Sequence, residues 1–88
     1  MEIKIIEIDC KELMQAEDLH ECLKKQLHFP DYYGKNLDAL YDCLCDQPCT
    51  CIVLKNAEEL DKDEYGKSLL ECFEDASANN VRLGLIEA

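Results

Sequence analysis

The chain has 88 residues, 48% of them hydrophobic, and its 20 acidic and 9 basic side chains give a formal net charge of −11. The hydrophobic content is that of a folded globule, and the length fits one domain, residues 1–88. A surface this acidic repels phosphate backbones and anionic lipids, so we expect no nucleic-acid or membrane partner. It would attract a basic protein, although plain solubility explains the same charge.

The first half of the chain predicts one strand and two helices. Residues 3–8 are rich in β-branched side chains and predict a strand. Apolar residues at helical spacing predict a helix over about residues 16–27, which Pro30 ends. Residues 31–34 are expected to be a loop in which Gly34 supplies a backbone conformation that other residues resist. A second helix is predicted over residues 36–45.

The second half predicts two strands around a long helical region. Residues 51–55 are a short apolar run, which is typical of a strand buried on both faces. Residues 57–78 follow a helical pattern, in one piece or with a break near Tyr65 and Gly66. Its core-facing positions are Tyr65, Leu69, Cys72, Phe73 and Ala76. Residues 81–86 predict the last strand. This order favours an α/β fold with a three-stranded parallel sheet packed by three to four helices.

Cellular location and thiol chemistry are constrained only weakly. The chain lacks the run of about 18–20 apolar residues that spans a bilayer, and its N-terminus has acids where a signal peptide needs positive charge. We therefore expect a cytoplasmic protein.

The seven cysteines fit free thiols that pack as small apolar residues. A metal site or redox pair among Cys43, Cys45, Cys49 and Cys51 is the alternative, although the spacing does not match usual zinc sites. We expect no metal and no cofactor.

An acidic stripe on the second helix carries the most information. Asp38, Asp42 and Asp46 recur every four residues, apart from the apolar stripe of the same helix. Like charges at this spacing destabilise a helix, and only Asp38 lies where the helix dipole offsets the effect. Three interpretations stay open: a solvated acidic face, a general acid–base pair, or a surface that binds arginines of a basic partner. Exposed carboxylates without a nucleophile or phosphate-loop motif weaken the enzyme interpretation.

The same stretch shows a family resemblance. The run Pro30-Asp31-Tyr32-Tyr33-Gly34-Lys35-Asn36-Leu37-Asp38-Ala39-Leu40-Tyr41-Asp42-Cys43-Leu44, preceded by Asp18-Leu19-His20 and Leu23-Lys24-Lys25, closely resembles the barstar family. Members of that family are intracellular inhibitors of the secreted ribonuclease barnase. The resemblance implies a three-stranded parallel sheet packed by helices and no enzymatic activity.

The resemblance also implies a partner and a site. The second helix and the loop before it would plug the basic active-site cleft of a barnase-like extracellular ribonuclease, with carboxylates in place of RNA phosphates. Asp42 would be the main anchor among the cleft's arginines and histidine, Asp38 would bond a neighbouring arginine, and Tyr32 would stack on the catalytic histidine. The further members of the expected contact are Tyr33, Gly34, Asn36, Leu37, Ala39 and Asp46.

Three positions depart from the family pattern. Tyr41 and Gln47 stand where a well-studied member has tryptophans near the interface, and Asp75 stands where the family has a glutamate that reaches the nuclease. Rim contacts with the partner, including those of Tyr41 and Asp75, are therefore expected to differ. We expect the free inhibitor to be a monomer. The alternative is a protein-binding module of the same fold for another basic partner, without nuclease inhibition.

Overall fold

The computed structural model describes residues 2–88, which form three strands and five helices. In chain order these elements are β1 (Lys4–Asp9), α1 (Cys10–Gln15), α2 (Leu19–Leu27), α3 (Leu37–Cys45), β2 (Thr50–Lys55), α4 (Glu58–Asp61), α5 (Glu64–Asn79) and β3 (Leu83–Glu87). No helix of this described part is long and apolar enough to cross a membrane.

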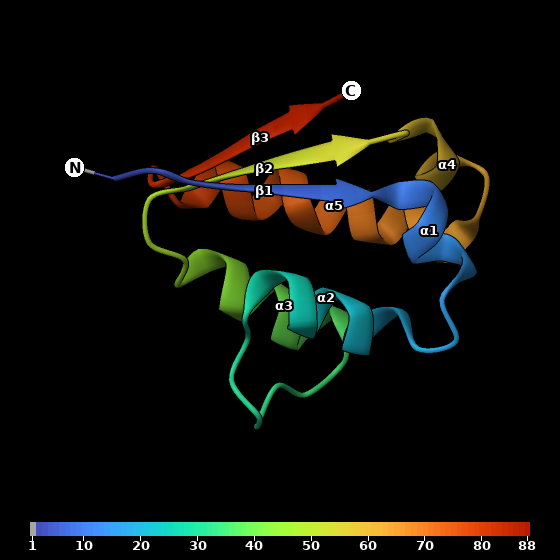
Figure 1. The fold of residues 1–88 in the computed structure, drawn as a ribbon, viewed down its shortest axis with the longest axis horizontal. Coiled ribbons are helices and arrows are strands. Elements are labelled where there is room, and N and C mark those ends of the chain that lie inside the picture. The colour runs from blue at the N-terminus through green and yellow to red at the C-terminus, as the bar shows by residue number, and fades with distance from the viewer. Residues whose placement is uncertain (1) are drawn as a thin grey trace.

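The strands form one parallel sheet in the order β1-β2-β3 (Figure 1). Ile5 pairs with Cys51, which pairs in turn with Gly84, so these three residues lie in one row across the sheet. The predicted α/β fold with a three-stranded parallel sheet is confirmed.

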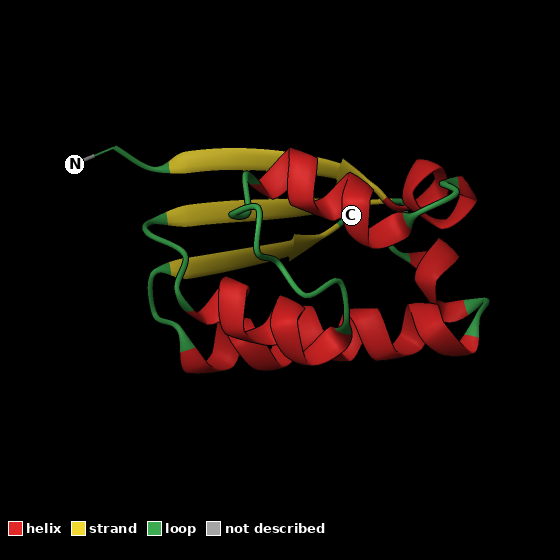
Figure 2. Ribbon diagram, turned by 90° about the horizontal axis from the view of Figure 1, so that it is seen from below, coloured by secondary structure: helices red, strands yellow, loops and turns green. Residues whose placement is uncertain are grey.

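Helices α2, α3 and α5 lie on one face of the sheet, and α1 and α4 lie at the end toward which the strands point (Figures 1 and 2). Ile52 and Leu54 point toward them and are fully buried, whereas Cys51 and Val53 between them are only partly buried. The prediction that this strand is buried on both faces is therefore wrong, because no helix of residues 2–88 covers the other face. The apolar run had looked like a strand between two helical layers.

The helices differ from the predictions at two places. The short helix α1 was not expected; Asp9 starts it by accepting a hydrogen bond from the Lys11 backbone N–H at 3.0 Å. The break in the long helical region falls between Asp61 and Glu64 rather than near Tyr65 and Gly66. Asp63 caps α5 there by accepting a bond from the Gly66 N–H at 3.2 Å, and a Cβ on Gly66 would lie 2.2 Å from the Leu60 carbonyl oxygen.

Asn80 joins the end of α3 to the start of β3. Its side-chain amide donates to the backbone carbonyls of Leu44 and Gln47, both at 3.1 Å, and its Oδ1 accepts from the Arg82 N–H at 3.0 Å. Helix α5 ends at Asn79, and Asn80 after it has an extended backbone. The amide bonds therefore explain why asparagine stands at this position.

Candidate protein-binding site

The acidic stripe lies on the exposed side of α3. Asn36 starts the helix by accepting a hydrogen bond from the Ala39 N–H at 2.8 Å. Asp38 in the first turn and Asp42 in the middle are exposed, and Asp46 is the exposed C-cap. The apolar side of the same helix buries Leu40 and Leu44 in the core. The stripe is thus oriented by packing on the opposite side of the helix.

The two tyrosines of the loop before α3 have different environments. Tyr32 is 87% exposed, which makes it one of the most exposed large side chains of the protein. Tyr33 is buried, with its ring 4.8 Å from that of Phe29 and its hydroxyl 2.7 Å from Nδ1 of His20. Burial raises the pKa of the Tyr33 hydroxyl, which stays protonated. Only Tyr32 of this pair presents its ring to a partner.

His20 was missed as a structural residue by the sequence reasoning. Its ring is buried, and its Nε2 lies 2.5 Å from the Tyr65 hydroxyl while Nδ1 contacts Tyr33. Burial lowers the pKa of His20, although the nearby Asp18 carboxylate opposes the shift. The neutral ring therefore connects α2, the loop and α5. Tyr65, expected in the core, is 41% exposed because only its hydroxyl end reaches His20.

The sharp backbone turn of the loop lies at Lys35, not at Gly34 as predicted. Lys35 has φ of 54°, whereas no glycine among residues 2–88 has a positive φ. Gly34 instead lies close to the start of α3, since a Cβ there would be 3.2 Å from the Cβ of Ala39, which is a tight contact. The Lys35 ammonium is 2.7 Å from Glu21 and 3.6 Å from Asp18, so it links the loop to the start of α2.

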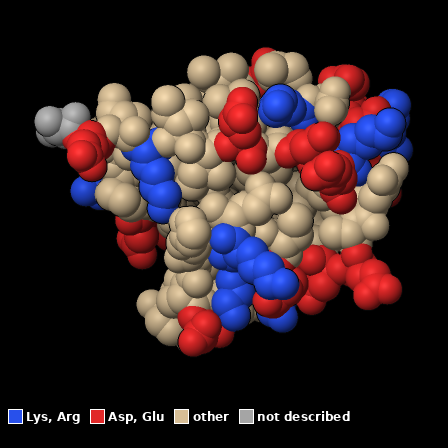
Figure 3. All heavy atoms as spheres, in the orientation of Figure 1, with Lys and Arg blue, Asp and Glu red and all other residues tan. Residues whose placement is uncertain are grey.

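Lys24 adds a second ion pair between α2 and the loop, 3.7 Å from Asp31. In Figure 3, basic and acidic side chains accordingly lie next to each other beside the loop that projects at the bottom of the view. The buried Tyr33 and the Asn36 cap tie the loop to the rest of the fold, and these exposed ion pairs add little to that. A pre-ordered loop loses less entropy on binding.

Tyr41 and Asp75 lie on the two helices that pack together beside the stripe. The half-buried Tyr41 accepts a hydrogen bond on its hydroxyl from Asn79 Nδ2 at 2.7 Å. Asp75 is exposed on α5, and its charge contributes to a raised pKa of Tyr41, whose main cause is the hydrogen bond with Cys45. The structure therefore brings Tyr41 and Asp75 together at the α3–α5 edge of the stripe.

A hollow of about 190 Å³ lies beside Tyr32. Its wall includes Tyr32 from the loop and Cys43, Asp46 and Gln47 from the end of α3.

The remaining predicted site residues differ in exposure. Asn36 is exposed, while Leu37 and Ala39 are half-buried and expose only part of their side chains. Of the predicted site residues, all but Tyr33 reach the surface with at least part of the side chain or, for Gly34, the backbone.

Two of the seven cysteines lie at this surface, Cys43 in the wall of the hollow and Cys45 beside Tyr41. All seven fall within residues 2–88 and none forms a disulfide. Among those residues no group of three histidine, cysteine, aspartate or glutamate side chains could hold a metal ion. Burial raises the pKa of Cys10 and of Cys72 to about 11, so both stay protonated thiols at neutral pH.

Comparison with known proteins connects these features to a family. A family model described as Barstar (barnase inhibitor) matches residues 3–84. The chain is also similar to a protein of Bacillus subtilis (strain 168) named "Putative ribonuclease inhibitor YrdF". The two are 47% identical over 78 residues, which is 83% of this chain and 84% of that protein.

Proposed function

Because the chain belongs to the barstar (barnase inhibitor) family, we propose that it is an intracellular inhibitor of a secreted barnase-type ribonuclease. It acts as a single-domain monomer in the cytoplasm and protects the cell that makes the nuclease. The proposal assigns no catalytic step to the chain. The loop before α3 and the exposed side of α3 would cover the basic active-site cleft of the nuclease.

One observation carries this proposal: three exposed aspartates follow one side of α3 and end beside the exposed Tyr32 ring. Carboxylates in a row along a helix can pair with arginines that otherwise bind successive phosphates. In this proposal Asp42 is the central anchor, Asp38 bonds a second arginine, and Tyr32 stacks on a ring of the partner.

The remaining expected contacts surround this centre. Gly34 and Asn36 line the loop end of the surface, and Leu37, Ala39 and Asp46 border the stripe. Tyr41 and Asp75 form its α5 edge. The Tyr41 hydroxyl accepts a hydrogen bond from Asn79 and also bonds with Cys45, so Tyr41 would offer mainly its ring edge to a partner. The rim would therefore suit a nuclease different in detail from barnase.

The test is inhibition of RNA cleavage by a barnase-type ribonuclease mixed with the purified chain. We expect a one-to-one loss of activity at micromolar inhibitor. Asp42→Ala should weaken binding by about 30-fold or more, because the partner's arginine would be left buried without a counter-charge. The matched control is Glu58→Ala on α4, an exposed acid away from the stripe.

The outcomes separate a defined site from general charge. If both substitutions weaken binding equally, the net charge and not the stripe explains the affinity. If cleavage proceeds undiminished, the chain does not inhibit that nuclease. Capture of a different basic protein through Asp42 would then favour the alternative of a binding module without nuclease inhibition.

A further inference from the structure

The hollow beside Tyr32 lies between the loop before α3 and the end of that helix. Its loop side is formed by residues 28–30 and Tyr32, and its helix side by Cys43, Asp46 and Gln47. Small-molecule pockets usually measure about 300–1,000 Å³. At about 190 Å³ this hollow is smaller, so it suits a single side chain of a partner.

The electrostatic potential inside the hollow is negative. Among the residues that line it, Asp46 is an acid and none is a lysine or arginine. The half-buried Cys43 responds to this potential: burial raises the pKa of its thiol, and the charges of Asp46 and Asp42 raise the pKa further. Two carboxylates thus act on the interior of the hollow. A cation that enters is stabilised there, whereas an anion is repelled.

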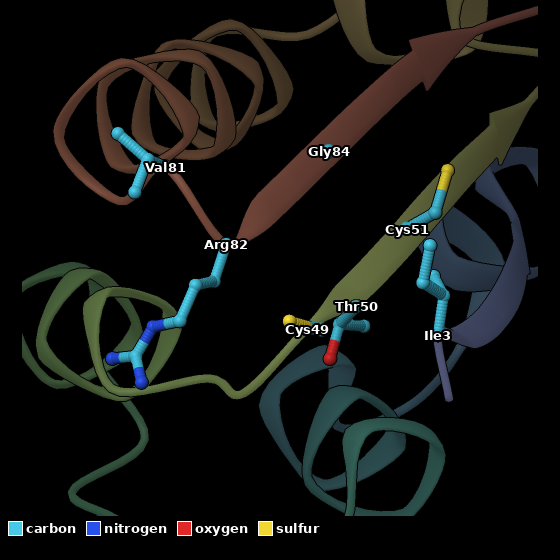
Figure 4. Close-up of a pocket in the computed structure, with 7 residues that line it drawn as sticks. All are labelled: Ile3, Cys49, Thr50, Cys51, Val81, Arg82 and Gly84. Carbon is cyan, nitrogen blue, oxygen red and sulfur yellow. The ribbon is translucent and has the colours of Figure 1, made fainter. Parts of the chain in front are cut away.

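A larger hollow at the start of the strands has a different chemistry (Figure 4). It measures about 270 Å³, and Arg82 is the one charged residue among those that line it. Its other lining residues are apolar, small or thiol-bearing, apart from Thr50. This wall has no acid that would select a cation. The hollow beside Tyr32 combines a carboxylate with an aromatic residue.

Tyr32 makes an arginine a better match than a lysine. Because Tyr32 lines the hollow and is 87% exposed, an incoming group can cover one face of its ring. A guanidinium group is planar, stacks on aromatic faces, and has donors in a fork that fits a carboxylate. A lysine ammonium has neither the plane nor the fork. The second face of the ring stays available for the partner ring assigned to Tyr32 above.

We propose that this hollow binds one arginine side chain of the nuclease, with the guanidinium group between the Asp46 carboxylate and the Tyr32 ring. The inference rests on the function proposed above and adds a specificity-determining contact to it. The arginine would link the loop to the C-terminal end of α3, where the helix dipole also favours a cation. It would be a different arginine from the one that pairs with Asp42.

Gln47 sets the room that the arginine has. The backbone carbonyl of Gln47 accepts a hydrogen bond from the Asn80 amide at 3.1 Å, while the half-buried residue also lines the hollow. Gln47→Trp therefore keeps the backbone bond and fills the hollow with a ring at unchanged net charge. Asp46→Asn removes the charge at nearly unchanged shape. The two variants test room and charge separately.

Nuclear magnetic resonance titration with N-acetyl-arginine amide tests the hollow without a nuclease. We expect the backbone amide signals of Tyr32, Asp46 and Gln47 to shift and to saturate. The midpoint should be on the order of 10–100 mM, because an exposed ion pair and one cation–π contact are each weak. N-acetyl-citrulline amide has nearly the same shape without the charge and should shift these signals at least about fivefold less. Sodium chloride at equal ionic strength corrects for screening.

Glu58 on α4 is the control for general attraction between charges, since it is an exposed acid outside the hollow. Its amide signal should shift little, and Glu58→Gln should titrate like the native chain. Asp46→Asn and Gln47→Trp should each remove the saturable shift. Shifts that do not saturate, equal shifts with the citrulline amide, equal shifts at Glu58, or a saturable shift that persists in Asp46→Asn would each overturn the proposal.

Binding to an inhibited nuclease then identifies the arginine. Each arginine of the nuclease is replaced by alanine and combined with Asp46→Asn and with Asp42→Asn. One arginine should couple to Asp46 by about three- to tenfold, and another to Asp42. If the nuclease is inhibited but no arginine couples to Asp46, the inference is wrong and the proposed function stands. If no nuclease is inhibited, the proposed function fails, and the titration alone decides whether the hollow takes a guanidinium group.

Discussion

Nδ1 of His20 lies 2.7 Å from the hydroxyl of Tyr33, inside the protein and directly beneath the loop that bears Tyr32. This bond makes the loop part of the folded core, because Tyr33 is the loop residue next to Tyr32. The backbone that carries the exposed Tyr32 ring is thus anchored to the core through the neighbouring Tyr33. The pairing explains why the two neighbouring tyrosines have opposite exposures.

The stability of the protein should depend on pH through His20. Burial lowers its folded pKa below the unfolded value of about 6.5, so the unfolded chain binds more protons in that range. The free energy of unfolding should therefore fall as the pH drops from about 6.5 through the folded pKa. Urea unfolding between pH 7.5 and 5 measures this slope, and His20→Gln should flatten it.

The second histidine supplies the control for that experiment. His28→Asn removes the other histidine at an exposed, left-handed position that asparagine tolerates, and serves as the matched variant. The carboxylates Asp9, Asp18 and Glu21 have lowered pKa values, and their contribution is lost only at lower pH, as the pH falls from about 4. Equal slopes for native and His20→Gln protein between pH 6.5 and 5 would contradict the assignment.

Lys35 should tolerate asparagine but not valine. Its left-handed backbone costs a β-branched side chain about 1–2 kcal/mol more than asparagine, and both substitutions remove the ion pairs with Glu21 and Asp18 equally. Lys35→Val should therefore lower the free energy of unfolding by that amount relative to Lys35→Asn. Paired urea titrations give the difference; identical midpoints would mean that the loop relaxes without cost.

Gly66 and Gly84 should respond oppositely to alanine. A Cβ at Gly66 would lie 2.2 Å from the Leu60 carbonyl oxygen, so Gly66→Ala should cost at least about 2 kcal/mol despite alanine's better helix propensity. At Gly84 the nearest atom is 3.7 Å away, and Gly84→Ala should be neutral or stabilise by about 0.5 kcal/mol. Thermal unfolding of both variants in dilute solution distinguishes them, and a stable Gly66→Ala would show that α4 moves freely against α5.

The hollow beside Tyr32 predicts graded effects along the acidic stripe. Asp46 borders this hollow as the C-cap of α3, at one end of the stripe, so a cation of the proposed partner would meet it at the edge of the contact. Asp46→Asn should weaken binding about three- to tenfold, mainly through slower association, and less than Asp42→Asn. Stopped-flow association at two salt concentrations checks this order. A larger loss at Asp46 than at Asp42 would move the centre of the interface toward Tyr32.

Much of the fold could be predicted because its signals are local. The spacing of Leu37, Leu40 and Leu44 placed α3, and the same residues orient the aspartates. The resemblance to the barstar family, read mainly from the run between Pro30 and Leu44, is confirmed by the family match over residues 3–84. Helix α1 was missed because six residues are too few to show a helical period.

The sequence predictions failed where the role of a residue depends on a contact with another part of the chain. Gly34 and Gly66 looked like conformational residues, yet neither has a positive φ. A side chain at Gly66 would collide with the Leu60 backbone, and one at Gly34 would lie tightly against Ala39. His20 looked like one more position on α2, and its hydroxyl partners lie 13 and 45 residues away in the sequence. Such contacts leave no periodic pattern in the chain.

Asn80 has a consequence for how this chain tolerates substitutions on the outside of α3. Its amide holds α3 through the backbone carbonyls of Leu44 and Gln47, groups that every residue type supplies. The position of the helix is therefore independent of the side chains on its outer surface. Substitutions on the outer surface of α3 would therefore change the groups that the helix presents, while the Asn80 bonds still hold the end of the helix in place.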